Sequence, residues 1–277
     1  MRLFILPFTS FICFLLIVSC KKDSDNTSPK CEIVNINVFS LNDDVSLGQA
    51  FHQQILTSPG YHILDSVQYS TAYAHLNRIK NNILASSAIE NKDKLAWKAY
   101  ILKDDTTLNA FCTPGGYIYV YTGILKYLDT EDDFAGVLGH EMGHAALRHS
   151  TKAMTSEYGL NTILSLLGNI TGSTATTLAS VAAKLGTLRY SRCHESEADD
   201  ASVRYLNGSA YKCNGAASFF QKLISSGSAT STPIFLSTHP DPGNRVISIN
   251  TKSASLGCNT LIGYSGNTWA NFKASLP

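Results

Sequence analysis

The stretch from Asp132 to Ser150 limits what this chain can fold into more than any other, because it places two histidines one helical turn apart in an apolar segment. It contains His140, Glu141 and His144 in the pattern H-E-x-x-H. At about 100° per residue, the two histidines lie about 40° apart on one helix face, so both imidazoles can reach a single metal ion. The pattern predicts a zinc site with Glu141 as an adjacent base, although so short a pattern also arises by chance. A third ligand must therefore come from elsewhere in the chain.

The residues around this stretch predict the limits of its helix. Thr130 can cap the first turn, and the acidic run at 131–133 favours a helix N-terminus. His149 lies five residues after His144, which on a continuous helix is about 140° away from the metal-facing side. We therefore interpret His149 as a helix-end residue and not as a ligand.

A second chemically informative stretch runs from Leu188 to Asp199 and reads LRYSRCHESEAD. Glu195 and Asp199 are four residues apart, so on a helix they share a face. One carboxylate of such a pair can complete a His, His, Glu zinc set, while the other accepts a hydrogen bond from the outer nitrogen of a ligand imidazole. Spacing alone leaves two alternatives open: Glu197 as the ligand, or an acidic surface helix without a metal.

Aromatic and β-branched residues are concentrated between residues 95 and 121, and they predict three strands. The strands are expected at Leu95–Leu102, Thr107–Cys112 and Tyr117–Tyr121, with Thr113–Gly116 as the turn between the last two. A strand beside a metal cleft can bind an extended peptide by adding it to the sheet. A purely structural sheet is the alternative.

Apolar residues recur at helical spacing in three other segments. They predict one helix over residues 45–57 and another over about 66–86. The segment 158–183 carries no charge, but polar residues at 171–174 interrupt it. Since a bilayer-spanning helix needs about 20 consecutive apolar residues, a helical hairpin packed over the core is favoured over membrane insertion.

The N-terminus has the pattern of a secretion signal. Arg2 is followed by the nearly continuous apolar run Leu3–Val18, and Ile17–Cys20 resembles the lipobox of bacterial lipoproteins. The pattern predicts a signal peptide at 1–19, a lipidated Cys20 with a flexible tether over 20–44, and a folded domain over 45–277. An ordinary signal peptide or a short membrane anchor is the alternative, and in either case the folded part is exported.

Charge and cysteine content exclude one class of partner and one kind of metal site. The net charge is +1 and no long basic run is present, so nucleic acid is not an expected partner. No C-x-x-C pair supports a cysteine-ligated zinc.

The cysteines instead suggest disulfides. Five remain when the signal and the lipidation site are set aside, namely Cys31, Cys112, Cys193, Cys213 and Cys258. Because five is odd, at least one is unpaired within the monomer. An exported chain can form disulfides, and we predict one between Cys213 and Cys258 because both lie in polar, loop-like surroundings.

Taken together, the motifs resemble a known family. HEMGH followed by SRCHESEAD is similar to the pattern of HtpX-like and CAAX-prenyl-protease-type zinc metallopeptidases, a gluzincin family. The similarity extends to Asn109–Phe111 with Pro114–Val120, to Thr238–Pro240 with Arg245, and to the opening helix at Val45–Gly48. It spans residues 45–246 in the same order as in the family.

The resemblance implies a fold and a set of residue roles. The fold is α+β, a mainly helical zincin-like metallopeptidase with a small β-sheet flanking the active-site helix. One zinc ion per chain would be bound by His140, His144 and Glu195, with Glu141 as the general base and Asp199 orienting a ligand histidine. His239 and Arg245 match positions near the active site, where either could stabilise an oxyanion or His239 could reach the zinc in a resting state. The substrate strand would involve Asn109, Gly115, Gly116 and Tyr117.

The function implied is peptide-bond hydrolysis by zinc-activated water, with Glu141 accepting the proton. We expect an endopeptidase of the bacterial cell envelope that acts on misfolded envelope proteins. It would be lipid-anchored at the periplasmic face of the outer membrane or at the cell surface, and would touch the membrane through Cys20 only. The oligomeric state stays open. The alternative is a chaperone-like or binding lipoprotein whose zinc site is structural or latent, for example because His239 occupies the water position.

Overall fold

The computed structural model describes residues 36–169, 175–226, 234–239, 242–261 and 268–277. The signal peptide, Cys20 and the first part of the tether lie outside the described residues, as do Thr171–Thr174 and Pro240. The strands are β1 (Lys98–Leu102), β2 (Ala110–Thr113) and β3 (Tyr117–Tyr121), with the 3-10 turns η1 (Pro114–Gly116) and η2 (Leu185–Thr187). The helices are α1 (Leu41–Thr57), α2 (Ser70–Leu84), α3 (Thr122–Tyr127), α4 (Glu131–Ala146), α5 (His149–Glu157), α6 (Leu160–Asn169), α7 (Ala175–Ala182), α8 (Arg192–Leu206), α9 (Gly215–Ser225), α10 (Ile234–Thr238), α11 (Pro242–Leu256) and α12 (Thr268–Ala274). The described chain is thus mainly helical with one small sheet, which confirms the predicted α+β class.

The three strands form one sheet in the order β1-β3-β2. β3 is the central strand: it runs parallel to β1 and antiparallel to β2. The connection from β2 to β3 is the Pro-Gly-Gly turn η1, as predicted, and Gly115 adopts a φ of 79°, which glycine reaches without steric cost. Among the described residues, β2 has a strand partner on one side only.

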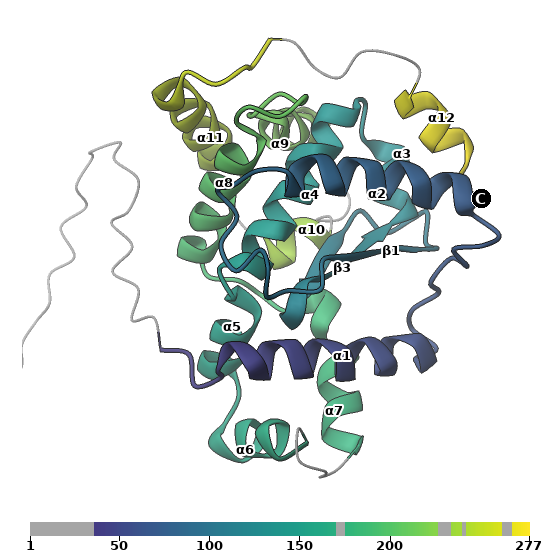
Figure 1. Cartoon of the computed structure of the whole chain (residues 1–277), viewed down its shortest axis with the longest axis vertical. Helices are drawn as coiled ribbons and strands as arrows, with labels where there is room; N and C mark the ends of the chain where they lie inside the picture. The colour runs from purple at the N-terminus through teal and green to yellow at the C-terminus, as the bar shows by residue number, and fades with distance from the viewer. Residues whose placement is uncertain (1–35, 170–174, 227–233, 240–241, 262–267) are drawn as a thin grey trace, which may run out of the picture. The chain divides into compact units, whose positions relative to one another are not determined.

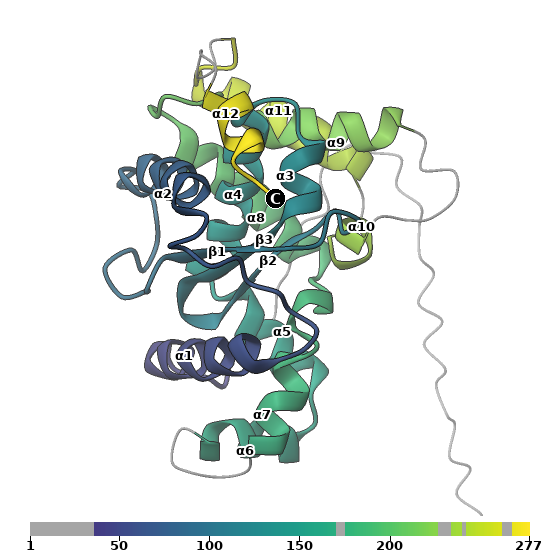
Figure 2. The ribbon, with the colours of Figure 1, turned by 90° about the vertical axis from the view of Figure 1, so that its right-hand side faces the viewer.

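Alternating residues of the sheet face two different layers. Ile118 and Val120 of β3 pack in the same hydrophobic cluster as α2 and α4. Tyr117 and Tyr119 point the other way and pack against α1. Both views show α1 on one side of the sheet and α2 with α4 on the other, while α6 and α7 lie beyond α1 (Figures 1 and 2). This is the two-residue period expected of a strand buried on both faces.

The helix α4 is the centre of the helical layer, and every one of its residues is buried. It begins as predicted: the Thr130 side chain accepts a hydrogen bond from the Asp133 backbone N–H, and the Asp133 carboxylate accepts one from Thr130 N–H. The helix α8 packs closely across it. A Cβ at Gly143 would lie 3.1 Å from the carbonyl oxygen of Ala198, so glycine allows the two backbones to approach. Close packing of α4 on α8 brings their polar residues together.

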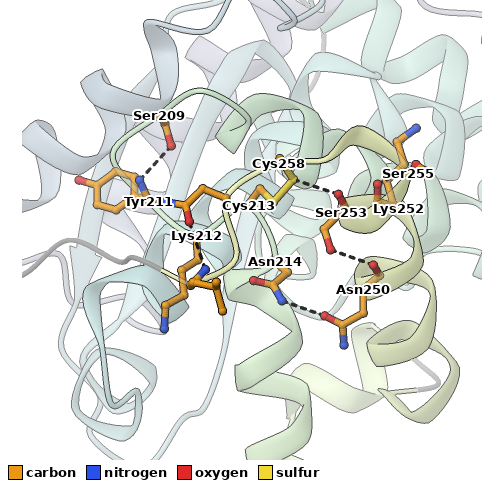
Figure 3. The surroundings of a disulfide bond; sticks show 12 residues. Ser209, Tyr211, Lys212, Cys213, Asn214, Asn250, Lys252, Ser253, Ser255 and Cys258 are labelled. Atoms are coloured by element: carbon orange, nitrogen blue, oxygen red, sulfur yellow. Dashed lines mark hydrogen bonds between the residues drawn. A yellow bond between two sulfur atoms is a disulfide. The ribbon is translucent and has the colours of Figure 1, made fainter.

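The C-terminal helices are joined to this layer by a disulfide. Cys213 lies just before α9 and bonds to Cys258, which follows α11, as predicted. Figure 3 shows the bond together with the hydrogen bond that Asn214 donates to Asn250. The described free cysteine is Cys112, which is buried in β2. The disulfide closes a loop that contains α9, α10 and α11.

Three predicted helices differ in length from their predictions, and the second of them, predicted over about 66–86, spans Ser70–Leu84. The first begins at Leu41, earlier than expected, because Ser40 and Asp43 form a capping box. The motif helix ends at Ala146, not near Ser150, since Arg148 adopts a left-handed φ of 62° before α5 begins. The uncharged segment 158–183 forms the expected helical pair α6 and α7. Within the described ranges, no helix has the length and apolar character required to cross a bilayer.

Candidate metal centre

The helix α4 places both motif histidines at one point inside the molecule. The Nε2 atoms of His140 and His144 lie 3.0 Å apart, and both rings are buried. This is the arrangement that their four-residue spacing predicts for one helix face. Glu141, also buried, lies beside them on the same turn.

The helix α8 adds a carboxylate to this pair. Its N-terminus is capped by Ser191, whose side chain accepts a hydrogen bond from the His194 backbone N–H. Glu195 follows in the first turn, with Oε1 3.3 Å from His144 Nε2 and Oε2 3.5 Å from His140 Nε2. The structure therefore brings together the three residues predicted as ligands.

A fourth donor comes from the end of α10. His239 Nδ1 lies 3.3 Å from His140 Nε2 and 3.0 Å from Glu195 Oε1. Donor atoms of all four residues lie within 4.8 Å of one another, and all four residues are buried.

These separations fit a zinc ion. With Zn–N and Zn–O distances of about 2.0–2.2 Å and tetrahedral geometry, neighbouring ligand atoms lie about 3.3–3.5 Å apart. The contacts among His140, His144, Glu195 and His239 span 3.0–3.5 Å. Two imidazoles with one carboxylate form a common catalytic zinc set, so the donor types fit as well.

The carboxylate of Glu141 is buried without a matching donor. Within the described part of the chain, neither of its oxygens has a hydrogen-bond partner, and the same is true of His239 Nε2. These two groups face each other across 3.6 Å. Buried polar atoms are nearly always paired, so this space is suited to a polar ligand such as water or a substrate carbonyl.

The two acidic residues of the site have opposite pKa shifts. Burial raises the pKa of Glu141, which makes it a stronger base than an exposed glutamate. Burial also acts to raise the pKa of Glu195, but the charges of His239 and Arg245 outweigh it and hold that pKa well below its usual range. Glu195 is therefore suited to remain an anion, and Glu141 to exchange a proton.

Asp199 and Arg245 support His140 from behind. Asp199 Oδ1 lies 2.9 Å from His140 Nδ1, the outer nitrogen of that ring, as predicted for an orienting carboxylate. Arg245 binds Asp199 with two hydrogen bonds of 2.7 Å, from Nε and Nη2, and its Nη1 lies 2.8 Å from Glu195 Oε2. The guanidinium thus faces two carboxylates.

The sequence interpretation missed a contact to the other histidine. His149 Nδ1 lies 2.9 Å from His144 Nδ1, and His149 Nε2 lies 2.9 Å from Glu197 Oε2. The donor cluster found in the described residues consists of His140, His144, Glu195 and His239 and does not include His149. The rotation argument that placed it far from the site assumed one continuous helix, whereas α4 ends before Arg148.

Three of the residues predicted for the substrate strand lie in the central strand and in the turn before it. Tyr117 was expected in a strand that receives substrate, but it lies in central β3, where Lys98 and Thr113 already pair with it on either side. Gly115 and Gly116 lie in η1, packed against α1 and against Leu95. Glycine at both positions thus permits close approach of the turn to these neighbours.

The edge strand beside the site is β2. Asn109, just before it, donates a hydrogen bond from Nδ2 to Gly186 O. Cys112 of β2 lies 3.8 Å from the Tyr190 hydroxyl, and the Tyr190 ring stacks on His144 at a centroid distance of 3.8 Å. Of the four predicted substrate-strand residues, Asn109 directly precedes this edge strand, while the other three lie in the turn and the central strand that follow it.

Comparison with known proteins gives consistent matches. The profile of Peptidase family M48 matches residues 71–253. The chain is 27% identical over 214 residues to mitochondrial metalloendopeptidase OMA1 of Schizosaccharomyces pombe, covering 76% of this chain and 61% of that protein. It is 28% identical over 219 residues to the beta-barrel assembly-enhancing protease of Yersinia pestis, covering 75% and 43%.

A third relative is matched over a larger share of its own length. Metalloprotease LoiP of Escherichia coli is 31% identical over 185 residues, which cover 65% of this chain and 69% of LoiP. The chain spans less than two thirds of the length of the first two relatives.

Proposed function

The chain belongs to peptidase family M48, a family of zinc metallopeptidases, and from this we propose that it is a zinc-dependent endopeptidase of the bacterial cell envelope. The observation that carries the proposal is the buried carboxylate of Glu141, which has no hydrogen-bond partner among the described residues and lies beside four converging donor atoms. Membership of family M48 is shown by the profile match. Assignment of the chain to the HtpX-like and CAAX-type branch is part of the proposal.

In this proposal the residues of the chain have distinct tasks. His140, His144 and Glu195 hold zinc, which supplies a Lewis acid that activates water and polarises a carbonyl group. Glu141 accepts a proton from the attacking water and passes it to the leaving amine, a task suited to its raised pKa. Arg245 holds Asp199 and Glu195 in place.

The substrate would bind as an extended chain along the outer edge of β2, which has no strand partner among the described residues and where Ser150 Oγ now donates a hydrogen bond to Cys112 O. In the antiparallel pair, Tyr121 N–H donates to Asn109 O, so the backbone groups of every second residue from Asn109 face β3. The backbone groups of Ala110 and Cys112 therefore face the outer edge. A peptide added there would be held by its own backbone, and its side chains would be read only weakly.

The first test is Glu141→Gln. We expect the variant to bind zinc as the wild type does but to lose peptide hydrolysis, because the amide cannot accept the water proton. Zinc content and cleavage of an unfolded protein substrate would be measured on the same sample. Wild-type turnover in the zinc-loaded variant would show that Glu141 is not the base.

A second candidate function is a latent site, and the position of His239 favours it. Its Nδ1 lies among the ligand atoms, so it could occupy the place of the water and keep the protease or binding lipoprotein inactive. His239→Ala then raises the rate of cleavage, whereas it lowers the rate if His239 stabilises an oxyanion, an effect commonly worth about 10²–10³ in kcat. Cleavage rates of the two purified proteins at equal zinc content decide between these roles.

Localisation and substrate complete the proposal. The lipobox-like Ile17–Cys20 supports a lipid anchor, and Cys20→Ala should release the chain from the membrane fraction of cells. Misfolded envelope proteins are the proposed substrates, and the similarity to the beta-barrel assembly-enhancing protease of Yersinia pestis supports a substrate in the envelope. Equal cleavage of folded and unfolded envelope proteins would contradict this substrate preference.

A further inference from the structure

We propose that His149 is a positioning residue that fixes the tautomer and ring orientation of His144, and that Glu197 in turn fixes His149. The inference deepens the proposed function and rests on it in one respect, that His144 binds zinc. It assigns a role to His149 and Glu197. Neither residue is among the proposed metal ligands, and no contact of either with Glu141 is described above.

The contacts form a continuous line of hydrogen-bonding atoms. His144 directs Nε2 toward the other ligand atoms, at 3.0 Å from His140 Nε2 and 3.3 Å from Glu195 Oε1. Its outer nitrogen, Nδ1, lies 2.9 Å from His149 Nδ1. The far nitrogen of His149, Nε2, lies 2.9 Å from Glu197 Oε2. Both imidazoles are buried.

The carboxylate at the end of this line determines where each proton lies. An ionised carboxylate accepts hydrogen bonds and donates none, so His149 must carry its proton on Nε2. The Nδ1 atom of neutral His149 is then an acceptor, and His144 must donate to it from a protonated Nδ1. This leaves the lone pair of His144 on Nε2, where a metal ligand requires it.

The surrounding groups hold both rings in the orientation that this line needs. Tyr190 stacks on His144, and His194 stacks on His149 with centroids 4.5 Å apart and planes 17° apart.

The backbone also contributes to the position of His149. Arg148 adopts a left-handed φ of 62°, and this turn starts α5 at His149. Two hydrogen bonds to the buried carboxylate of Asp44, one from Nε at 2.6 Å and one from Nη2 at 3.1 Å, hold Arg148 in that turn. The N-terminal helix α1 therefore helps to place the ring that supports His144.

The test compares zinc affinity among variants, because a packing role would not depend on hydrogen-bonding groups. His149→Leu removes the acceptor, while His149→Asn returns an acceptor oxygen close to the place of Nδ1. Glu197→Gln offers an amide that can donate to His149 and so reverse the proton order. Glu157→Gln, on the exposed end of α5, makes the same change of charge without contacting either histidine and is the matched control.

Zinc affinity is measured by competition with a chelator, and the visible absorption spectrum of the cobalt-substituted chain reports the ligand field. Outer partners of metal-binding histidines typically contribute about 10- to 100-fold in affinity, so His149→Leu should lose that much. His149→Asn should recover most of the loss, Glu197→Gln should lose affinity, and Glu157→Gln should match the wild type. The cobalt spectrum should change in His149→Leu and Glu197→Gln only.

Two outcomes would overturn the inference. One is wild-type zinc affinity and an unchanged cobalt spectrum in His149→Leu. The other is a loss in His149→Leu that His149→Asn does not recover, with Glu197→Gln like the wild type, which would assign only a packing role to the ring. If His149→Leu does not fold, His149→Asn and Glu197→Gln still decide, since the inference requires the glutamine variant to bind zinc more weakly. A wild-type chain that binds zinc but cleaves no peptide contradicts the proposed function alone.

Discussion

The two motif histidines are supported in different ways, although they lie one turn apart on the same helix. Behind His140 is Asp199, a fully buried carboxylate held by the buried guanidinium of Arg245. Behind His144 is a second imidazole, and the carboxylate that orients it belongs to Glu197, whose side chain is 36% exposed. The first support is a charged cluster inside the core, whereas the second ends at the surface. We therefore expect substitutions that remove the support of His140 to lower both the free energy of unfolding and the zinc affinity. Substitutions that remove the support of His144 should lower chiefly the zinc affinity.

The largest expected effect comes from Arg245→Met. The change leaves Asp199 and Glu195 as buried carboxylates without their cation, and loss of one partner of a buried ion pair commonly costs about 3–5 kcal/mol. The free energy of unfolding of the metal-free chain, from urea denaturation, measures it. Lys252→Met is the matched control, because Lys252 on the same helix pairs with Asp200 at the surface, where such pairs contribute about 0–1 kcal/mol. Equal losses of unfolding free energy in Arg245→Met and Lys252→Met would contradict the interpretation that Arg245 stabilises a buried charged cluster.

The next largest effect is expected from breaking the Cys213–Cys258 bond by changing both residues to serine. A loop of this length contributes about 2–4 kcal/mol to stability, chiefly by restricting the unfolded chain. The loop encloses His239 and Arg245, so zinc affinity should fall together with the free energy of unfolding. Denaturation and chelator competition on the same preparation measure both. If the double variant is as stable as the wild type, the disulfide does not stabilise the region around His140 that contains His239 and Arg245.

The smallest effect is expected at Arg148, on the His144 side. Arg148→Ala and Arg148→Gly both remove the hydrogen bonds to Asp44, but only alanine keeps the steric cost of a left-handed φ, about 1–2 kcal/mol per residue. The glycine variant should therefore be the more stable of the two in urea denaturation. Higher stability of the alanine variant would show that the turn does not persist without the ion pair.

Features set by local geometry were predictable from the sequence. The common face of His140 and His144 follows from helix periodicity, and the cap at Thr130 follows from its position before three acidic residues. The shared face of Glu195 and Asp199 follows from their four-residue spacing on α8, and the contact of Asp199 with His140 agrees with what the family resemblance implied.

Features set by long-range packing or by an unmarked break were not predictable. No glycine or proline marks the end of α4, since the left-handed residue is an arginine whose conformation is stabilised by Asp44, 104 residues away. Without that break, His149 could not be placed beside His144. The direction of Arg245 toward Asp199 likewise depends on the packing of α11 on α8.

The metal centre is assembled from residues that are far apart along the chain. Contacts between His140 and His239, and between Arg245 and His140, join positions 99 and 105 residues apart. Contacts of such range form late in folding, because the entropy of closing a long loop must be overcome first. A partly synthesised chain that ends before α8 already contains H-E-x-x-H but lacks Glu195. The donor set is therefore complete only when Glu195 of α8 and His239 at the end of α10 have joined the two histidines of α4.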